Sequence, residues 1–196
     1  MKVINKLTTL KNVNTLRSNN IDNIILHSTY SHKNFNHVLN THYSYGWNGV
    51  GYHYFIDKKG TIFQARGDNH EGAHALGYNT SSLGICVYSE KGILSSKNKL
   101  VVQSLIKDLS LKYKNPEIIS HTHAQARYCN SFLNSIGYEN ILPDTPEIVF
   151  SELFDKTLMK LNSISEKLSS SKYHLEKQAL KFFKNCPGPF FFEVVK

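Results

Sequence analysis

A lysine stands two residues before a cysteine near the end of the chain, in the segment KNCPGPFF at 184–191. A cysteine thiolate is a common zinc ligand, and a nearby ammonium can stabilise negative charge that develops on a substrate oxygen. Lys184 and Cys186 therefore have the chemistry of an open, catalytic metal site. Taken alone, the segment would more often be a proline-rich turn around a buried cysteine, because lone cysteines usually pack as small core residues.

Two histidines change that balance, because each stands in a short apolar run of the sequence. His27 lies in IILHST at 24–29, and His121 ends PEIISH at 116–121. Such runs predict buried strands, and a sheet that brings the strand ends together would make the two imidazoles converge. Singly, each histidine is more often a packed strand-end side chain. Together with a thiolate, they form the ligand set of a catalytic zinc site whose fourth position is open to water.

The segments that must position these residues follow an α/β pattern. Helical spacing of apolar residues predicts helices over 32–43 and 99–113, and alternating or continuous apolar runs predict strands at 24–29, 52–56, 61–64, 83–88 and 116–121. The second helix is expected to bury a face made of Leu100, Val101, Leu105, Leu109 and Leu111. Strand alternation places Tyr52 and Tyr54 on one face.

Five ordered segments resemble the type 2 N-acetylmuramoyl-L-alanine amidase family, the zinc amidases that include phage endolysins and peptidoglycan-recognition proteins. The segments are IILHST at 24–29, GWNGVGYHYFIDKKGTIFQAR at 46–66, GAHALGYNTSSLGICV at 72–87, IISH at 118–121 and KNCPGPFF at 184–191. The resemblance covers about 20–129 and resumes at the C-terminus. It implies a central mixed β-sheet flanked by helices.

The resemblance also implies roles for individual residues. His27, His121 and Cys186 would hold Zn²⁺, Tyr52 would orient the attacking water or the oxyanion, and Lys184 would stabilise that oxyanion. His74 and Trp47 would line the substrate groove, although an exposed loop position and a packing role are the plainer interpretations. One branch of the family has a glutamate where this chain has Cys86, so the tyrosine-dependent branch is the closer match.

The segment between His121 and Cys186 is longer than in most relatives, and it leaves the third ligand open. Residues 130–183 resemble an inserted pair of helices, over 146–168 and 172–183, that returns the chain to the site or serves as a packing appendage. Cys129, eight residues after His121 and two after Arg127, also matches the family spacing. Asn130 replaces the usual proline there, so we favour Cys186 with Lys184 and expect Cys129 to be a buried thiol.

Composition is consistent with one domain over 1–196 that carries this C-terminal helical insertion. The 196 residues are 40% hydrophobic, with no apolar run long enough to cross a membrane and no signal-peptide core at the N-terminus. Three cysteines without a close pair favour reduced thiols and synthesis in the cytoplasm. We expect a monomer that acts on the cell wall after release, or on wall fragments in the cytoplasm.

These observations predict a cell-wall lytic zinc amidase, similar to an endolysin, that cuts the bond between N-acetylmuramic acid and L-alanine. A secreted effector and a recycling enzyme remain alternatives, as does a module that binds peptidoglycan or muropeptides without cutting them. The net charge of +8 suits acidic wall polymers. Because no nucleic-acid motif accompanies that charge, we expect neither a nucleic-acid nor a membrane partner.

Overall fold

The computed structural model describes residues 3–6, 20–29, 32–90 and 93–135. The chain folds as two compact units, one made of 1–119 and 187–196 and the other of 120–186. The predicted insertion at 130–183 lies outside the described residues beyond residue 135, as do its two helices, so the domain organisation stays a prediction.

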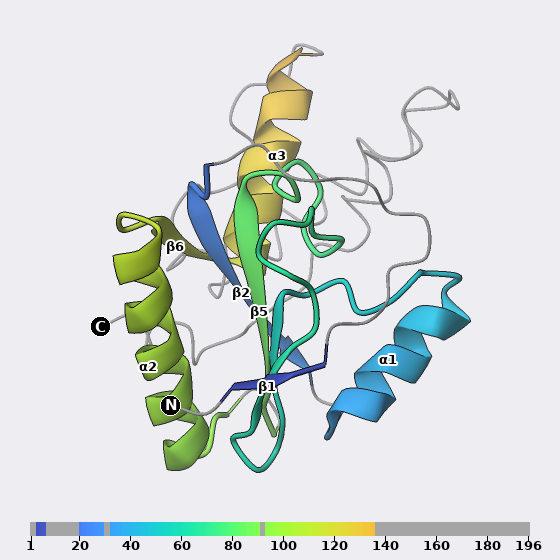
Figure 1. The fold of residues 1–196 in the computed structure, drawn as a ribbon. Helices are drawn as coiled ribbons and strands as arrows, with labels where there is room; N and C mark the ends of the chain where they lie inside the picture. The colour runs from blue at the N-terminus through green and yellow to red at the C-terminus, as the bar shows by residue number, and fades with distance from the viewer. Residues whose placement is uncertain (1–2, 7–19, 30–31, 91–92, 136–196) are drawn as a thin grey trace. The chain divides into compact units, whose positions relative to one another are not determined.

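Within the described residues, six strands form one mixed sheet in the order β1-β4-β3-β5-β2-β6. The strands are β1 Val3–Asn5, β2 Asn23–Thr29, β3 Tyr54–Ile56, β4 Ile62–Gln64, β5 Ser82–Tyr88 and β6 Glu117–Ser120. The helices are α1 Phe35–Ser44, α2 Ser96–Lys112 and α3 His121–Ser135. The predicted mixed α/β architecture is confirmed (Figure 1).

The sheet packs on both faces, and α1 and α2 lie on opposite sides of its strands (Figure 1). Along β5, Leu83, Ile85 and Val87 join the core beneath α2, whereas Cys86 joins the smaller core beneath α1. This alternation follows from the period of two in a strand. The smaller core also contains Phe35 and Phe55.

The turn between β3 and β4 forms as the sequence predicts. The Asp57 carboxylate accepts hydrogen bonds from the backbone N–H groups of Lys59 and Thr61, both at 2.8 Å. Gly60 has a φ of +75°, which a glycine adopts without strain. The hairpin is shorter than predicted, because β3 begins at Tyr54 rather than Tyr52.

The predicted apolar face of α2 is partly wrong. Leu100 is 68% exposed and Leu111 is 74% exposed. The hydroxyl of Ser95 accepts from the N–H of Asn98 and caps a helix that starts at Ser96, before the predicted 99. The buried face recurs at helical spacing and consists of Asn98, Val102, Leu105, Ile106 and Leu109.

The sequence predicts that His121 ends a strand, but in the structure it opens a helix. β6 ends at Ser120, and the Ser120 hydroxyl accepts a hydrogen bond from the N–H of His123 at 3.0 Å. A serine in that position caps the first turn of a helix, so α3 starts at once. The chain then stays helical through Cys129 to Ser135.

A buried carboxylate, Asp68, ties the segment after β4 to the end of α2. Its Oδ1 accepts from the Tyr54 hydroxyl at 2.8 Å, and its Oδ2 accepts from Lys112 Nζ at 2.9 Å and the Tyr113 hydroxyl at 2.8 Å. Burial alone would raise the pKa of Asp68, but these hydrogen bonds and the Lys112 charge hold it below its ordinary value. The same burial and the Asp68 charge raise the pKa of Tyr54.

We predict that Asp68→Ala lowers the free energy of unfolding by about 2–4 kcal/mol, because two tyrosine hydroxyls lose their acceptor. Since the folded-state pKa of Asp68 is depressed, its contribution is present above about pH 4, the ordinary pKa of an aspartate, and is lost as the pH falls through the folded-state value. Urea unfolding at several pH values measures both effects. Asp108→Ala, at an exposed position of α2, is the matched control. Equal stability of the two variants would contradict the prediction.

Candidate active site

The candidate site is built around His27, near the end of β2. Its side chain is only 2% exposed. The His27 Nε2 atom lies 3.0 Å from Nδ1 of His74, and its ring centroid lies 5.0 Å from that of Tyr52. The structure therefore brings together three residues that the sequence predicts for one site and that lie far apart in the chain.

The register between β2 and β5 sets the face on which His27 lies. His27 is paired with Cys86, which belongs to the core beneath α1, while Leu26 belongs to the core beneath α2. His27 thus lies on the α1 side of the sheet, and Gly84 occupies the same face of β5 two residues before Cys86.

Tyr52 and Tyr54 do not share a face, contrary to the expectation from alternation. Tyr52 precedes β3 and packs beside the core under α1, whereas Tyr54 lies in the other core and bonds Asp68. The backbone between them bends at His53. The N–H of His53 donates to Gly84 O at 2.9 Å, and the N–H of Gly84 donates to Nδ1 of His53 at 3.0 Å. Tertiary bonds to β5 therefore override simple strand alternation here.

The ring of His74 occupies a narrow slot between two glycines. A Cβ at Gly84 would lie 2.6 Å from His74 Cγ, and one at Gly72 would collide with the same ring. Asn79 Oδ1 accepts from the backbone N–H groups of His74 at 2.8 Å and Ala75 at 2.9 Å. His74 is consequently held by its backbone and its ring, unlike an ordinary exposed loop residue.

Trp47 lies at the exposed edge of an aromatic group that leads to Tyr52. It is 41% exposed, and its ring centroid lies 4.7 Å from that of His42, which lies 5.4 Å from that of Tyr52. The N–H of Gly51 donates to His42 Nδ1 at 3.0 Å. Burial, with smaller effects of the His32 and Arg66 charges, lowers the pKa of His42 to about 4, so it is a neutral part of the scaffold.

Arg66 is a buried residue that supports the site and that the sequence alone did not single out. Its Nε donates to Val50 O at 2.7 Å and its Nη1 donates to Glu71 O. These carbonyls belong to the loops that lead to Tyr52 and His74, and the N–H of Ala73 joins the same loops by donating to Gly51 O at 3.0 Å. Arg66 ends the segment GTIFQAR, but its type and position gave no sign that it would bond two loop carbonyls.

The placement of the other predicted ligands relative to this group stays a prediction, because His121 belongs to the second unit. His121 opens α3 in the second unit, and burial lowers its pKa to about 4, which keeps its imidazole neutral at neutral pH. Lys184 and Cys186 lie outside the described residues, and Cys129 is described only as a backbone position of α3. Among the described residues, no three histidine, cysteine or acidic side chains form a group that could hold a metal ion.

The helical course of α3 bears on the choice between the two cysteines. Residues eight apart in an α-helix are separated by about 12 Å along the axis. Ligands of one zinc ion must converge within about 2–2.3 Å of the metal. The helix separates the backbone positions of His121 and Cys129 in this way, and the choice between Cys129 and Cys186 stays a prediction.

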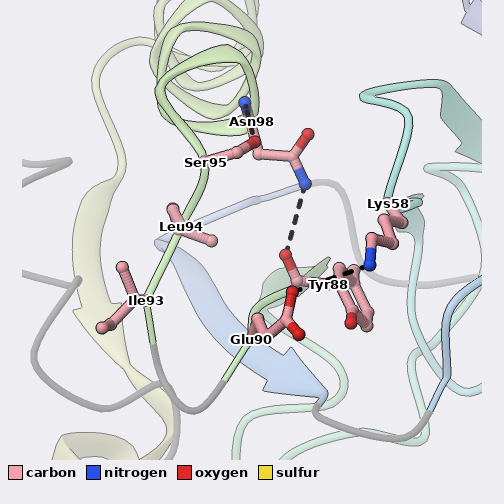
Figure 2. A pocket seen from close by; sticks show the side chains of 7 residues that line it. All are labelled: Lys58, Tyr88, Glu90, Ile93, Leu94, Ser95 and Asn98. Carbon is pink, nitrogen blue, oxygen red and sulfur yellow. Dashed lines mark hydrogen bonds and ion pairs between the residues drawn. The ribbon is translucent and has the colours of Figure 1, made fainter.

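A pocket lies at the end of β5 (Figure 2). It has a volume of about 450 Å³, and its lining residues are Lys58, Tyr88, Glu90, Ile93, Leu94, Ser95 and Asn98. Lys58 Nζ lies 3.6 Å from Glu90 Oε2 and 5.6 Å from the centre of the Tyr88 ring. The pocket contains none of the residues predicted for catalysis.

Comparison with known proteins identifies the family of the chain. The profile of the N-acetylmuramoyl-L-alanine amidase family matches residues 17–132, a segment that includes His27, Tyr52, His74 and His121. It also includes Cys129 and stops before Cys186.

Individual relatives are an endolysin, a recognition protein and an amidase. The chain is 32% identical over 101 residues to the endolysin of Escherichia phage T7, covering 46% of this chain and 65% of the endolysin. It is 48% identical over 42 residues to peptidoglycan-recognition protein LE of Drosophila melanogaster, covering 21% of this chain and 12% of that protein.

The amidase LysC from Clostridium intestinale URNW has the same fold, with a TM-score of 0.53 at 22% identity over 83% of this chain and 98% of LysC. The family profile covers more than half of the chain, and the mixed sheet agrees with it. The chain therefore belongs to the type 2 N-acetylmuramoyl-L-alanine amidase family.

Proposed function

We propose that this protein is a zinc-dependent amidase that hydrolyses the bond between N-acetylmuramic acid and L-alanine in peptidoglycan, as a cell-wall lytic, endolysin-like enzyme. The observation that carries the proposal is the group formed by the buried His27 with Tyr52 and His74 inside the segment that matches the amidase family. The similarity to a phage endolysin supports a lytic role.

The donor set fits zinc. His27 and His121 are imidazoles from two segments of the family match, and the low pKa of His121 leaves it in the neutral form that binds metal. A cysteine thiolate would complete three protein ligands. The closer match of KNCPGPFF to the family motif favours Cys186, whereas the extent of the family match favours Cys129.

Zinc in such a site supplies a Lewis acid for the scissile carbonyl and lowers the pKa of a water molecule toward neutrality. Tyr52 lies beside His27, so its phenol can orient the attacking water or the oxyanion and can move a proton. The ammonium of Lys184 would stabilise the oxyanion that develops on the carbonyl oxygen.

Trp47 and the net charge of +8 suit a substrate that is extended and acidic. A half-exposed indole can pack on the sugar or peptide of the wall, and the positive charge draws the protein toward acidic wall polymers. No helix in the described part of the chain has the length and apolar composition to span a membrane. We propose that the substrate is peptidoglycan or its fragments.

A second candidate function is recognition of muropeptides without cleavage. The similarity to a Drosophila peptidoglycan-recognition protein favours it. Incubation of the purified protein with purified peptidoglycan separates the two functions, because an amidase releases new L-alanine amino groups and a recognition module only pellets with the wall. Binding without release of amino groups would support recognition.

The purified protein should contain about one zinc ion per chain, because its ligand set is that of a catalytic zinc site. Metal analysis measures the content, and dialysis against a chelator should abolish release of L-alanine amino groups. Activity should return when Zn²⁺ is added back. Full activity of protein shown to be free of metal would contradict the proposed cofactor.

Tyr52→Phe should lower turnover by about ten- to ten-thousand-fold while the zinc content stays unchanged, because the lost hydroxyl moves a proton and does not hold the metal. Tyr43→Phe, at an exposed position of α1, removes a hydroxyl away from the site and serves as the control. An equal rate for Tyr52→Phe and the wild type would return Tyr52 to a packing role.

Two serine variants test the third ligand. If Cys186 is the ligand, Cys186→Ser should lose zinc and activity, because a neutral hydroxyl is a poor substitute for a thiolate, and Cys129→Ser should keep both. Cys86→Ala is the control, since Cys86 is buried in the core under α1. Loss of zinc in Cys129→Ser and retention in Cys186→Ser would assign the site to the shorter spacing.

Lys184→Ala should keep zinc and slow the reaction by about a hundredfold or more, the scale of losing one oxyanion donor. Arg127→Ala should have little effect, because Arg127 accompanies the disfavoured cysteine. Single-turnover rates with metal-loaded protein measure both variants. A large loss in Arg127→Ala with none in Lys184→Ala would reverse the assignment of the cationic group.

A further inference from the structure

A row of polar contacts runs from the start of β5 to His27. The Ser82 hydroxyl donates to Tyr78 O at 2.6 Å. Ser82 Oγ lies 3.4 Å from His74 Nε2, and His74 Nδ1 lies 3.0 Å from His27 Nε2. Because Ser82 Oγ has one proton for two of these contacts, and a neutral imidazole has one N–H, the direction of one hydrogen bond determines the direction of the next.

The direction starts at Ser82, whose single hydroxyl proton is committed to the carbonyl of Tyr78. Ser82 Oγ can then only accept from His74, so Nε2 of His74 carries a proton. In a neutral imidazole the other nitrogen is an acceptor, so His74 Nδ1 accepts from His27 Nε2. His27 is thereby the tautomer with a proton on Nε2 and the lone pair on Nδ1.

The opposite direction is disfavoured by the same contacts. If His74 donated from Nδ1 to His27, its Nε2 lone pair would face the lone pairs of Ser82 Oγ. To relieve that repulsion, Ser82 would have to give up its 2.6 Å bond to Tyr78 O. The 3.4 Å contact between Ser82 Oγ and His74 Nε2 is long for a hydrogen bond. The 2.6 Å bond from Ser82 to Tyr78 O nevertheless makes Ser82 Oγ the acceptor in that contact.

His74 has little freedom to turn and escape this arrangement. Gly72 and Gly84 enclose the ring, and Asn79 holds the backbone N–H of His74 at 2.8 Å. The ring of His53 lies edge-on to it, with centroids 5.5 Å apart. A ring in such a slot keeps one orientation, which is what a residue that orients another must do.

We propose that His74 and Ser82 are positioning residues that hold His27 in the Nε2–H tautomer, so that His27 presents Nδ1 to the zinc ion. The inference rests on the proposed zinc site. In this proposal His74 orients the metal ligand His27, whereas its place in the family motif implies a contact with substrate. Hydrogen bonds to the second nitrogen of a ligating histidine commonly fix its tautomer and orientation in this way.

Nitrogen-15 NMR of the histidine rings in the full-length, metal-free protein tests the tautomer without any variant and without activity. The proposal expects His27 to carry its proton on Nε2, and Cd²⁺ or Zn²⁺ to shift its Nδ1 resonance. A proton on Nδ1 of His27 in the metal-free protein, or coordination through Nε2, would overturn it.

Zinc affinity, measured by competition with a chromophoric chelator, tests the two positioning residues. His74→Ala should weaken zinc binding by about ten- to a hundredfold, the usual effect of losing such a partner, and Ser82→Ala should weaken it less. His74→Asn offers an amide oxygen near the position of Nδ1 and should recover part of the loss. Ser81→Ala, at the neighbouring serine, is the matched control and should bind zinc like the wild type.

The outcomes separate this inference from the proposed function. If the protein binds zinc and His74→Ala binds it equally well, His74 does not position His27 and the inference is wrong. If His74→Ala keeps its zinc affinity but raises KM, His74 contacts substrate instead. If the wild type binds no zinc while His27 carries its proton on Nε2, the hydrogen-bond row is correct and the zinc amidase proposal fails.

Discussion

The candidate site depends on the parallel pairing of β2 with β5. The ladder runs without interruption from Asn23 with Ser82 to Thr29 with Tyr88. It places His27 on the α1 side of the sheet and, on the same side of β5, leaves the space above Gly84 that the His74 ring fills. A slip of one residue would turn His27 toward the core beneath α2, because side chains alternate along a strand.

Two loops carry the other residues of the candidate site, and hydrogen bonds between side chains and backbone groups hold both loops. Arg66 donates to carbonyls of the loops around Val50 and Glu71, and Asn79 holds the turn that carries His74. Catalytic groups on loops need such support, because a shift of about 1 Å can cost about a hundredfold in rate. The neutral His42 adds an aromatic contact between Tyr52 and Trp47.

The two faces of the sheet differ in packing, and the candidate site lies on the face with the smaller core. Asp68 joins Tyr54, Lys112 and Tyr113 and ties the end of α2 to the segment after β4. The site residues instead lie on the face opposite α2, where the packed core is smaller and contains Cys86 and Phe55. The larger packed core beneath α2 can support a candidate site on the α1 side, since sites are most precise on well-packed elements.

The sequence alone determined the family and the mixed α/β class, and it proposed the residues of the candidate site. Period-two and helical spacing located β2 to β6, α1 and α2 to within a few residues, because those periods reflect local backbone geometry, whereas β1 and α3 were not predicted. The ordered segments around His27, Tyr52 and His74 contain the family's motif residues, so these candidates could be recognised from the sequence. The KNCPGPFF segment contains the predicted ligand Cys186 and the predicted cation Lys184. Both lie outside the described residues and stay predictions.

Only the tertiary structure decided which side chains meet. Tyr52 and Tyr54 lie on different faces because His53 bonds Gly84 of another strand. Leu100 and Leu111 are exposed because α2 packs through the face that carries Val102, Leu105, Ile106 and Leu109. The bond between His27 and His74 joins residues 47 positions apart. Such contacts depend on strand register and loop closure, which no local pattern encodes, so the contact of His27 with His74 and the bonds of Arg66 to two loop carbonyls were found only in the folded chain.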